Sequence, residues 1–140
     1  MHSSDYELII NEIDFKMLIE HAKRNYPFEA CALLFGKIKG NTYRVNKVLL
    51  AENILNSSVS FKIDENFLLN AYENAEKEGL DLVAIFHSHP ALPYPSSLDK
   101  KFMALNPVPW VILSMPSLDF KAHIFKNNSF IEVHIVREEI

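Results

Sequence analysis

Two histidines, a serine and an aspartate that could act together on a carbonyl group lie close to one another in the sequence. The motif His-Ser-His-Pro spans residues 87–90, and Ser96 and Asp99 follow after a short loop. Imidazole nitrogens and carboxylate oxygens bind zinc, and catalytic zinc sites usually combine three protein ligands with one open position. His87, His89 and Asp99 satisfy that requirement. We therefore predict that these three residues bind Zn²⁺, and that the metal helps a water molecule attack a carbonyl.

The residues before the motif indicate how it is positioned. Residues 82–86, Leu-Val-Ala-Ile-Phe, form an apolar run typical of a buried strand. Because side chains two apart on a strand point to the same face, His87 and His89 are expected to leave the strand's end side by side. Pro90 ends the strand. The proline-rich loop that follows is expected to return Asp99 toward the two histidines.

A purely structural role also fits these residues. Ser96, followed three residues later by Asp99, matches a helix N-cap with an acidic residue in the first turn, and residues 100–105 favour a short helix. A His-x-His pair is common without any metal. The two explanations are compatible, because an aspartate fixed in the first turn of a helix is an oriented ligand. The chain has one cysteine, Cys31, which argues against a thiolate metal site.

The rest of the chain alternates between strand and helix patterns. Residues 14–25 carry an amphipathic stripe, and Asp64 is placed to cap a second helix that ends near Gly79. We expect strands at residues 7–11, 30–39, 42–53, 82–86, 110–114, 119–126 and 130–136, and helices at residues 14–25, 64–78 and after Ser96. This order predicts an α/β fold, with a mixed sheet between helices in one domain that spans residues 1–140.

Composition excludes several classes of function. The net charge of −4, without a basic cluster to offset it, argues against binding to nucleic acid. No apolar stretch approaches the roughly 18–20 residues of a membrane span. Residues 1–5 are polar and acidic, so we expect no signal peptide. A single cysteine suits a reducing compartment, and we expect the protein to be cytoplasmic.

Taken together, these motifs resemble a known family. His-Ser-His-Pro at residues 87–90, followed by Pro-Ser-x-x-Asp at residues 95–99, resembles the signature of the JAMM (MPN+) zinc metalloproteases. Residues 26–36 resemble the segment in which that family keeps its catalytic glutamate, here Glu29. The resemblance extends over residues 8–136, where Asn53, Phe61 and Asp64 also fall at positions at which family members often have the same residue types.

Two positions depart from the family pattern. Six residues separate His89 from Ser96, which is one fewer than usual in the family, and Ala32 stands where glycine is frequent. Neither departure removes a functional group. The family also contains metal-free scaffold proteins, which typically have lost the histidines or the aspartate, and this chain has lost none of them.

The resemblance implies a fold, a mechanism and a class of substrate. The implied fold is α/β and cytidine-deaminase-like, with a curved mixed sheet flanked by helices. Zinc would be held by His87, His89 and Asp99, Glu29 would be the general base for the zinc-bound water, and Ser96 would donate a hydrogen bond to the oxyanion. The implied reaction is cleavage after the C-terminal Gly-Gly tail of a ubiquitin-like modifier or a sulfur-carrier protein, at an isopeptide or a linear peptide bond.

Several alternatives remain open at this point. The compact chain, without long insertions, resembles stand-alone prokaryotic and especially archaeal deubiquitinase-like members, and a homodimer or a proteasome-type assembly is compatible with it. A catalytically silent scaffold subunit is one alternative. A hydrolase that releases cysteine from a sulfur carrier is a second. RadC-like proteins carry related motifs, but their His-Asn-His-Pro-Ser-Gly version differs from residues 87–91 of this chain.

Overall fold

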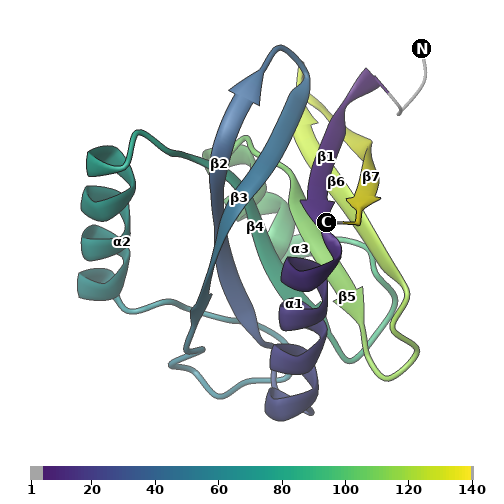
Figure 1. The fold of residues 1–140 in the computed structure, drawn as a ribbon. Helices are drawn as coiled ribbons and strands as arrows, with labels where there is room; N and C mark the ends of the chain where they lie inside the picture. Colours follow the sequence, from purple (N-terminus) through teal and green to yellow (C-terminus); the bar gives the residue numbers. More distant parts are fainter. Residues whose placement is uncertain (1–4, 140) are drawn as a thin grey trace.

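The computed structural model describes residues 5–139, which form seven strands and three helices (Figure 1). In chain order the elements are β1 (Glu7–Asn11), α1 (Glu12–Asn25), β2 (Cys31–Lys39), β3 (Thr42–Ala51), α2 (Glu65–Lys77), β4 (Asp81–His89), α3 (Ser97–Leu105), β5 (Trp110–Ser114), β6 (Phe120–Lys126) and β7 (Ser129–Glu138). The prediction of one domain over residues 1–140 stays a prediction. Residues 1–4, on which the signal-peptide prediction mainly rests, lie outside the described residues, as does residue 140.

The seven strands form one curved sheet that closes on itself in the order β1-β3-β2-β4-β5-β6-β7. The sheet is mixed: β4 and β5 run parallel, while β2 is antiparallel to both β3 and β4. Closure depends on β1, which runs parallel to β3 on one side and to β7 on the other. The predicted mixed, curved sheet is therefore confirmed, but closure into a barrel was not predicted.

The two faces of the sheet bury different helices. Ala32 and Leu34 of β2 belong to a cluster that also contains Phe15 and Leu18 of α1. The intervening residues of β2, such as Leu33, pack in a second cluster with Ala71 and Ala75 of α2 and Met103 of α3. This division follows from the strand period of two, which sends neighbouring side chains to opposite faces. Figure 1 shows α1 and α2 on different sides of the strands.

The helices begin at residues that cap them. The side chain of Asp64 accepts hydrogen bonds from two backbone amides of α2, and Ser96 forms a reciprocal capping box at the start of α3. Both caps were predicted. The helix expected at residues 14–25 begins instead at Glu12, because the Asn11 side chain accepts from the amide of Asp14 and caps the helix two residues earlier.

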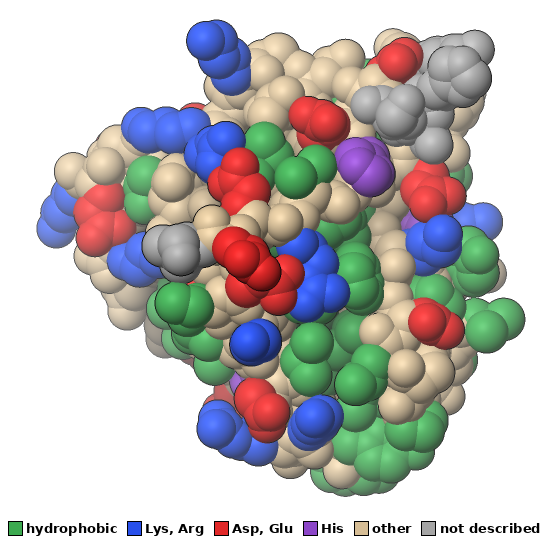
Figure 2. Space-filling model, turned by 45° about the vertical axis from the view of Figure 1, so that its right-hand side comes forward, with side chains coloured by type: hydrophobic (Ala, Val, Ile, Leu, Met, Phe, Trp, Pro, Cys, Tyr) green, Lys and Arg blue, Asp and Glu red, His purple; other side chains and the backbone are tan. Residues whose placement is uncertain are grey.

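None of the helices in the part of the chain that the structure describes has the length and apolar character that a membrane span requires. On the face shown in Figure 2, lysine and arginine side chains are interspersed with aspartate and glutamate side chains. No extended basic surface is visible on that face.

Candidate metal and active site

The C-terminal end of β4 carries the two histidines of the motif. β4 extends through His89, so both histidines lie within the strand. The apolar run alone had predicted that the strand ends at residue 86, just before them. Their side chains share one face of the sheet, and their Nε2 atoms are 3.0 Å apart. Ser88 between them points to the other face, where its Oγ accepts a hydrogen bond of 2.8 Å from the amide of Ala30.

Asp99 completes a small triangle with the histidine pair. Its Oδ2 lies 3.1 Å from Nε2 of His87 and 3.1 Å from Nε2 of His89. Ligands about 2.0–2.1 Å from a tetrahedral metal ion lie roughly 3.3–3.4 Å from one another. Three donor atoms converge here at close to that spacing, so the residues fit a metal ion.

The first turn of α3 orients the Asp99 carboxylate. Its Oδ2 accepts a hydrogen bond of 2.9 Å from the amide of Ser96, and the Asp99 amide donates to Oγ of Ser96 at 3.0 Å. Burial alone would raise the pKa of Asp99, but the hydrogen bonds from His87 and His89 outweigh burial and hold the pKa well below its usual value. Asp99 is therefore ionised, as a metal ligand must be. Capping and metal binding are compatible in this geometry.

In a neutral His89 ring, the environment of Nδ1 favours a free Nε2 lone pair. Nδ1 of His89 lies 3.2 Å from the carbonyl oxygen of Leu92, and a proton on Nδ1 leaves Nε2 available to a metal. His87 is fully buried, and burial lowers its pKa, so its ring is neutral. For His89, burial lowers the pKa, but Asp99 and Glu29 outweigh that effect and raise it. A metal ion would displace this proton.

Aromatic side chains enclose His87. The ring of Phe61 lies 4.9 Å from the ring of His87, centroid to centroid, at an interplanar angle of 30°. The indole of Trp110 lies edge-on to the same imidazole at 5.9 Å. No pattern in the sequence indicated that Trp110 lies against His87. These contacts fix the ring plane of His87.

Glu29, two residues before the start of β2, lies close to the histidine pair. Its Oε2 is 3.8 Å from Nε2 of His89, and the ligand atoms of Glu29, His87 and His89 all lie within 4.8 Å of one another. Burial raises the pKa of Glu29 to about 7, while His89 lowers it and Asp99 raises it. Both carboxylates therefore lie near the histidines, and Asp99 lies closer to them than Glu29 does.

The short loop between His89 and Ser96 still brings Asp99 to the histidines. Ser114, at the end of β5, donates from Oγ to the carbonyl of Ala91, and the amide of Met115 donates to the carbonyl of His89 at 2.7 Å. β5 therefore fixes the start of the loop. The one-residue deletion relative to the family pattern leaves the two histidines and Asp99 together.

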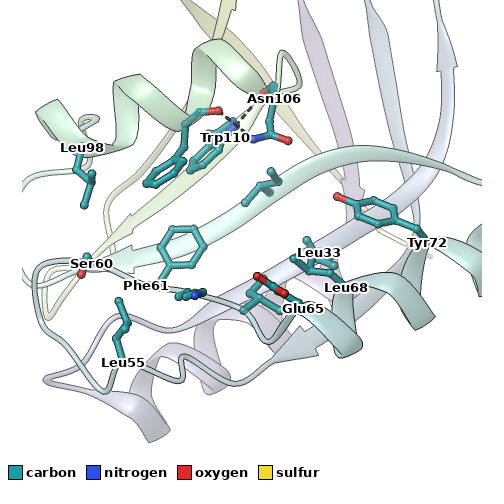
Figure 3. A pocket seen from close by; sticks show the side chains of 14 residues that line it. Leu33, Leu55, Ser60, Phe61, Glu65, Leu68, Tyr72, Leu98, Asn106 and Trp110 are labelled. Carbon is teal, nitrogen blue, oxygen red and sulfur yellow. Dashed lines mark hydrogen bonds between the residues drawn. The ribbon is translucent and has the colours of Figure 1, made fainter.

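A largely apolar cavity of about 580 Å³ lies beside the site, between α2 and α3 (Figure 3). Phe61 and Trp110 separate this cavity from His87, since both line it and both contact the histidine ring. Leu98 and Phe102 of α3 contribute to the wall opposite α2. The sequence pattern did not predict this cavity, because it depends on how the two helices are spaced over the sheet.

Comparisons with known proteins identify relatives of this chain. The family model described as prokaryotic homologs of the JAB domain matches residues 13–123. A desampylase from Pyrococcus furiosus is 44% identical over 112 residues, which cover 79% of this chain and 76% of that protein. CysO-cysteine peptidases from Mycobacterium bovis and Mycobacterium tuberculosis are 29% identical over 110 residues, covering 78% of this chain and 74% of theirs.

A solved structure supports the same relationship. A protein from Desulfitobacterium hafniense, whose structure was determined in solution, superimposes with a TM-score of 0.83 at 30% sequence identity. The superposition covers 95% of this chain and 94% of the other. It confirms the predicted α/β fold of the JAMM/MPN type, and the relatives confirm the resemblance to compact prokaryotic members. Because the family model matches most of the chain and a relative is 44% identical to it, this chain belongs to the prokaryotic homologs of the JAB domain.

Proposed function

We propose that this chain is a zinc-dependent peptidase or isopeptidase that cleaves after the C-terminal Gly-Gly tail of a ubiquitin-like modifier or a sulfur-carrier protein. One observation carries the proposal. Nε2 of His87, Nε2 of His89 and Oδ2 of Asp99 converge at 3.0–3.1 Å, with the carboxylate of Glu29 3.8 Å from the nearest of these nitrogens. This is the arrangement that a three-ligand metal site with an adjacent general base requires.

In the proposed mechanism, His87, His89 and Asp99 hold the metal ion. Zinc suits two imidazoles and one carboxylate, and when bound it would polarise the scissile carbonyl and make a water molecule acidic enough to react at neutral pH. Glu29 takes the proton from the attacking water at its carboxylate and passes it to the nitrogen of the leaving amine. A pKa raised by burial to about 7 suits a group that both accepts and returns a proton near neutral pH.

Ser96 serves the oxyanion in this mechanism. Its Oγ already accepts the amide hydrogen of Asp99, which leaves the hydroxyl hydrogen free to donate to a substrate oxygen. A donor held in place before the reaction stabilises the charge that develops on the carbonyl oxygen. The same serine therefore caps the helix that orients Asp99 and, in this proposal, donates to the substrate oxygen.

The relatives and the cavity support the substrate class. The names desampylase and CysO-cysteine peptidase describe, for those proteins, the removal of a group from a small modifier or carrier protein. The cavity between α2 and α3 offers an apolar surface next to the metal site, against which the extended tail of such a protein can lie. An active enzyme is favoured over a silent scaffold, because every donor of the proposed site is present.

Release of cysteine from a sulfur carrier is a second candidate, favoured by the similarity to CysO-cysteine peptidases. It uses the same groups on the enzyme and differs only in the leaving amine. A cytoplasmic location and assembly as a homodimer or in a proteasome-type complex stay predictions.

The test is a digest of modifier fusions. Purified protein loaded with zinc is incubated with a linear fusion, an isopeptide conjugate and a carrier–cysteine conjugate, each with and without a chelator. We expect chelator-sensitive cleavage after the terminal glycine of at least one substrate, and the preferred leaving group separates the two candidates. Loaded protein that cleaves none of them would defeat the proposal and favour the scaffold alternative.

A further inference from the structure

Asn53 is a buried polar residue that follows β3 and uses its whole amide group in hydrogen bonds. It is 4% exposed. Its Nδ2 donates to the carbonyl of Glu29 at 2.9 Å and to that of Ser60 at 3.1 Å. Its Oδ1 accepts from the amides of Leu55 at 3.1 Å and Lys62 at 3.2 Å. The side chain therefore connects Glu29 with a loop, residues 54–62, that is distant from it in sequence.

The backbone of Glu29 depends on this loop. Regular pairing of β2 begins only at Cys31, so the sheet ladder does not fix the residue that carries the carboxylate. The amide of Glu29 donates to the carbonyl of Ser57 at 2.8 Å, and its carbonyl accepts from Asn53. Both main-chain polar groups of Glu29 thus bond to residues 53–57. A shift of this segment would move the carboxylate relative to His89.

The same loop reaches the metal site and the cavity. Phe61 stacks on His87, and Leu55, Ser60 and Phe61 all line the cavity between α2 and α3. In Figure 3, Ser60 and Phe61 lie on the loop that borders the cavity. Asn53 is therefore placed where the general base and the cavity wall meet.

We propose that Asn53 is a positioning residue for Glu29: its side-chain amide holds the backbone of the base against the loop of residues 54–62. This inference rests on the proposed function, in which Glu29 is the base. Asn53 does not itself contact the donor atoms of His87, His89 or Asp99, so it acts on proton transfer and not on metal binding. A misplacement of a catalytic group by about 1 Å can lower turnover roughly 100-fold.

Asn53→Asp removes the N–H groups from the hydrogen bonds to Glu29 and Ser60 and puts a carboxylate oxygen in their place. The aspartate keeps an oxygen for the amides of Leu55 and Lys62, but it has no N–H to donate to Glu29 and Ser60. Asn11→Asp is the matched control. Asn11 also accepts a backbone amide through Oδ1 and donates through Nδ2, but it caps α1, away from the site. We expect Asn53→Asp to lower kcat about 10- to 100-fold with its zinc content retained, and Asn11→Asp to keep the wild-type kcat.

A double-mutant cycle with Glu29→Gln separates positioning from a general structural role. If Asn53 acts through Glu29, Asn53→Asp costs no further turnover once the carboxylate is gone. An equal loss in both backgrounds, or a wild-type kcat in folded Asn53→Asp, overturns the proposal. If Asn53→Asp does not fold, Asn53→Ser is carried through the same cycle with the same criteria.

Hydrogen exchange provides a readout that does not depend on activity. In Asn53→Asp we expect the Glu29 amide to exchange at least about tenfold faster than in the wild type, with amides of β6 and β7 unchanged. Unchanged exchange at Glu29 overturns the positioning role even if turnover falls. If the Glu29 amide exchanges faster in Asn53→Asp but the wild type cleaves no substrate, the positioning role is supported and the proposed function fails. Failure of the positioning role can therefore be told apart from failure of the proposed function.

Discussion

The carboxylate of Glu29 approaches His89 without a hydrogen bond to it: Oε2 of Glu29 lies 3.8 Å from Nε2 of His89. Its other oxygen, Oε1, is buried and has no hydrogen-bond partner among the described residues. Leaving a buried carboxylate oxygen unpaired costs free energy. An unpaired acceptor beside a candidate metal site is explained if it faces the attacking water, so the cost is consistent with function.

Replacing this carboxylate should stop turnover and spare the metal. Glu29→Gln keeps the size of the side chain but cannot accept a proton, so we expect kcat to fall about 10²- to 10⁴-fold. Zinc content, measured by atomic absorption after dialysis, should stay near one per chain, because three other residues supply the ligands in the proposed site. Loss of the metal from Glu29→Gln would instead identify Glu29 as a ligand, and full activity would refute its role as the base.

The same substitution should stabilise the metal-free protein, and more so at high pH. Burial raises the pKa of Glu29 from 4.5 to about 7, so the folded state binds the proton more tightly than the unfolded state. That contribution to stability is present below pH 4.5 and is lost as the pH rises through about 7. Glu29→Gln does not ionise, and its advantage over the wild type should grow to the order of 1–3 kcal/mol at pH 8.

Urea unfolding with a chelator present, at pH 5 and at pH 8, measures this difference. Glu73→Gln, at an exposed position of α2, serves as the control and should show no comparable growth with pH. If the difference in unfolding free energy between Glu29→Gln and the wild type is the same at pH 8 as at pH 5, the folded protein solvates this carboxylate.

Local sequence patterns predicted most strands and helices, because such elements depend mainly on residues close together in the sequence. The strands at Glu7–Asn11 and Trp110–Ser114 are confirmed residue for residue, and Asp64 caps α2 as expected. Closure of the sheet was not predictable in this way. β1 has partners more than 30 residues and more than 120 residues away, and its own five residues do not specify them.

The candidate site also combines features that local sequence patterns predict with features that depend on distant residues. That Asp99 would meet the histidines followed from strand period and helix capping, which are local, although its role as a ligand stays a prediction. The cavity and the stacking of Phe61 on His87 depend on a loop and two helices that meet only in the folded chain. The position of Glu29 came from the family resemblance, since a glutamate before a strand has no local pattern of its own.

Asp99 should contribute to metal affinity through its charge. Asp99→Asn keeps an oxygen for the Ser96 amide, so the cap can survive, but it removes the carboxylate from the triangle with His87 and His89. We expect zinc affinity to fall about 100-fold or more, measured by competition with a chromophoric chelator. Asp64→Asn makes the same change in the cap of α2, away from the donor atoms, and should leave zinc affinity unchanged.

Ser114 should matter for the metal although it is not a ligand. Its hydroxyl fixes the carbonyl of Ala91, in the loop that connects His89 to Asp99. Ser114→Ala frees that loop, and we expect zinc affinity to fall about tenfold in the same competition assay. Ser117→Ala, at an exposed position after the same strand, should have no effect. Unchanged affinity in Ser114→Ala would mean that the three donors stay aligned without this contact.

Ser96 has two roles that substitution can separate. Ser96→Ala removes the acceptor for the Asp99 amide, which should cost about 1 kcal/mol of stability, and it also removes the proposed donor to the oxyanion. We expect kcat of the zinc-loaded variant to fall about 10²- to 10³-fold, far more than the lost cap explains. Ser96→Thr keeps a hydroxyl at the same position and should restore most of both. If Ser96→Ala unfolds earlier in urea but turns over at the wild-type rate once loaded with zinc, the serine only caps α3, and the oxyanion must be stabilised by other groups.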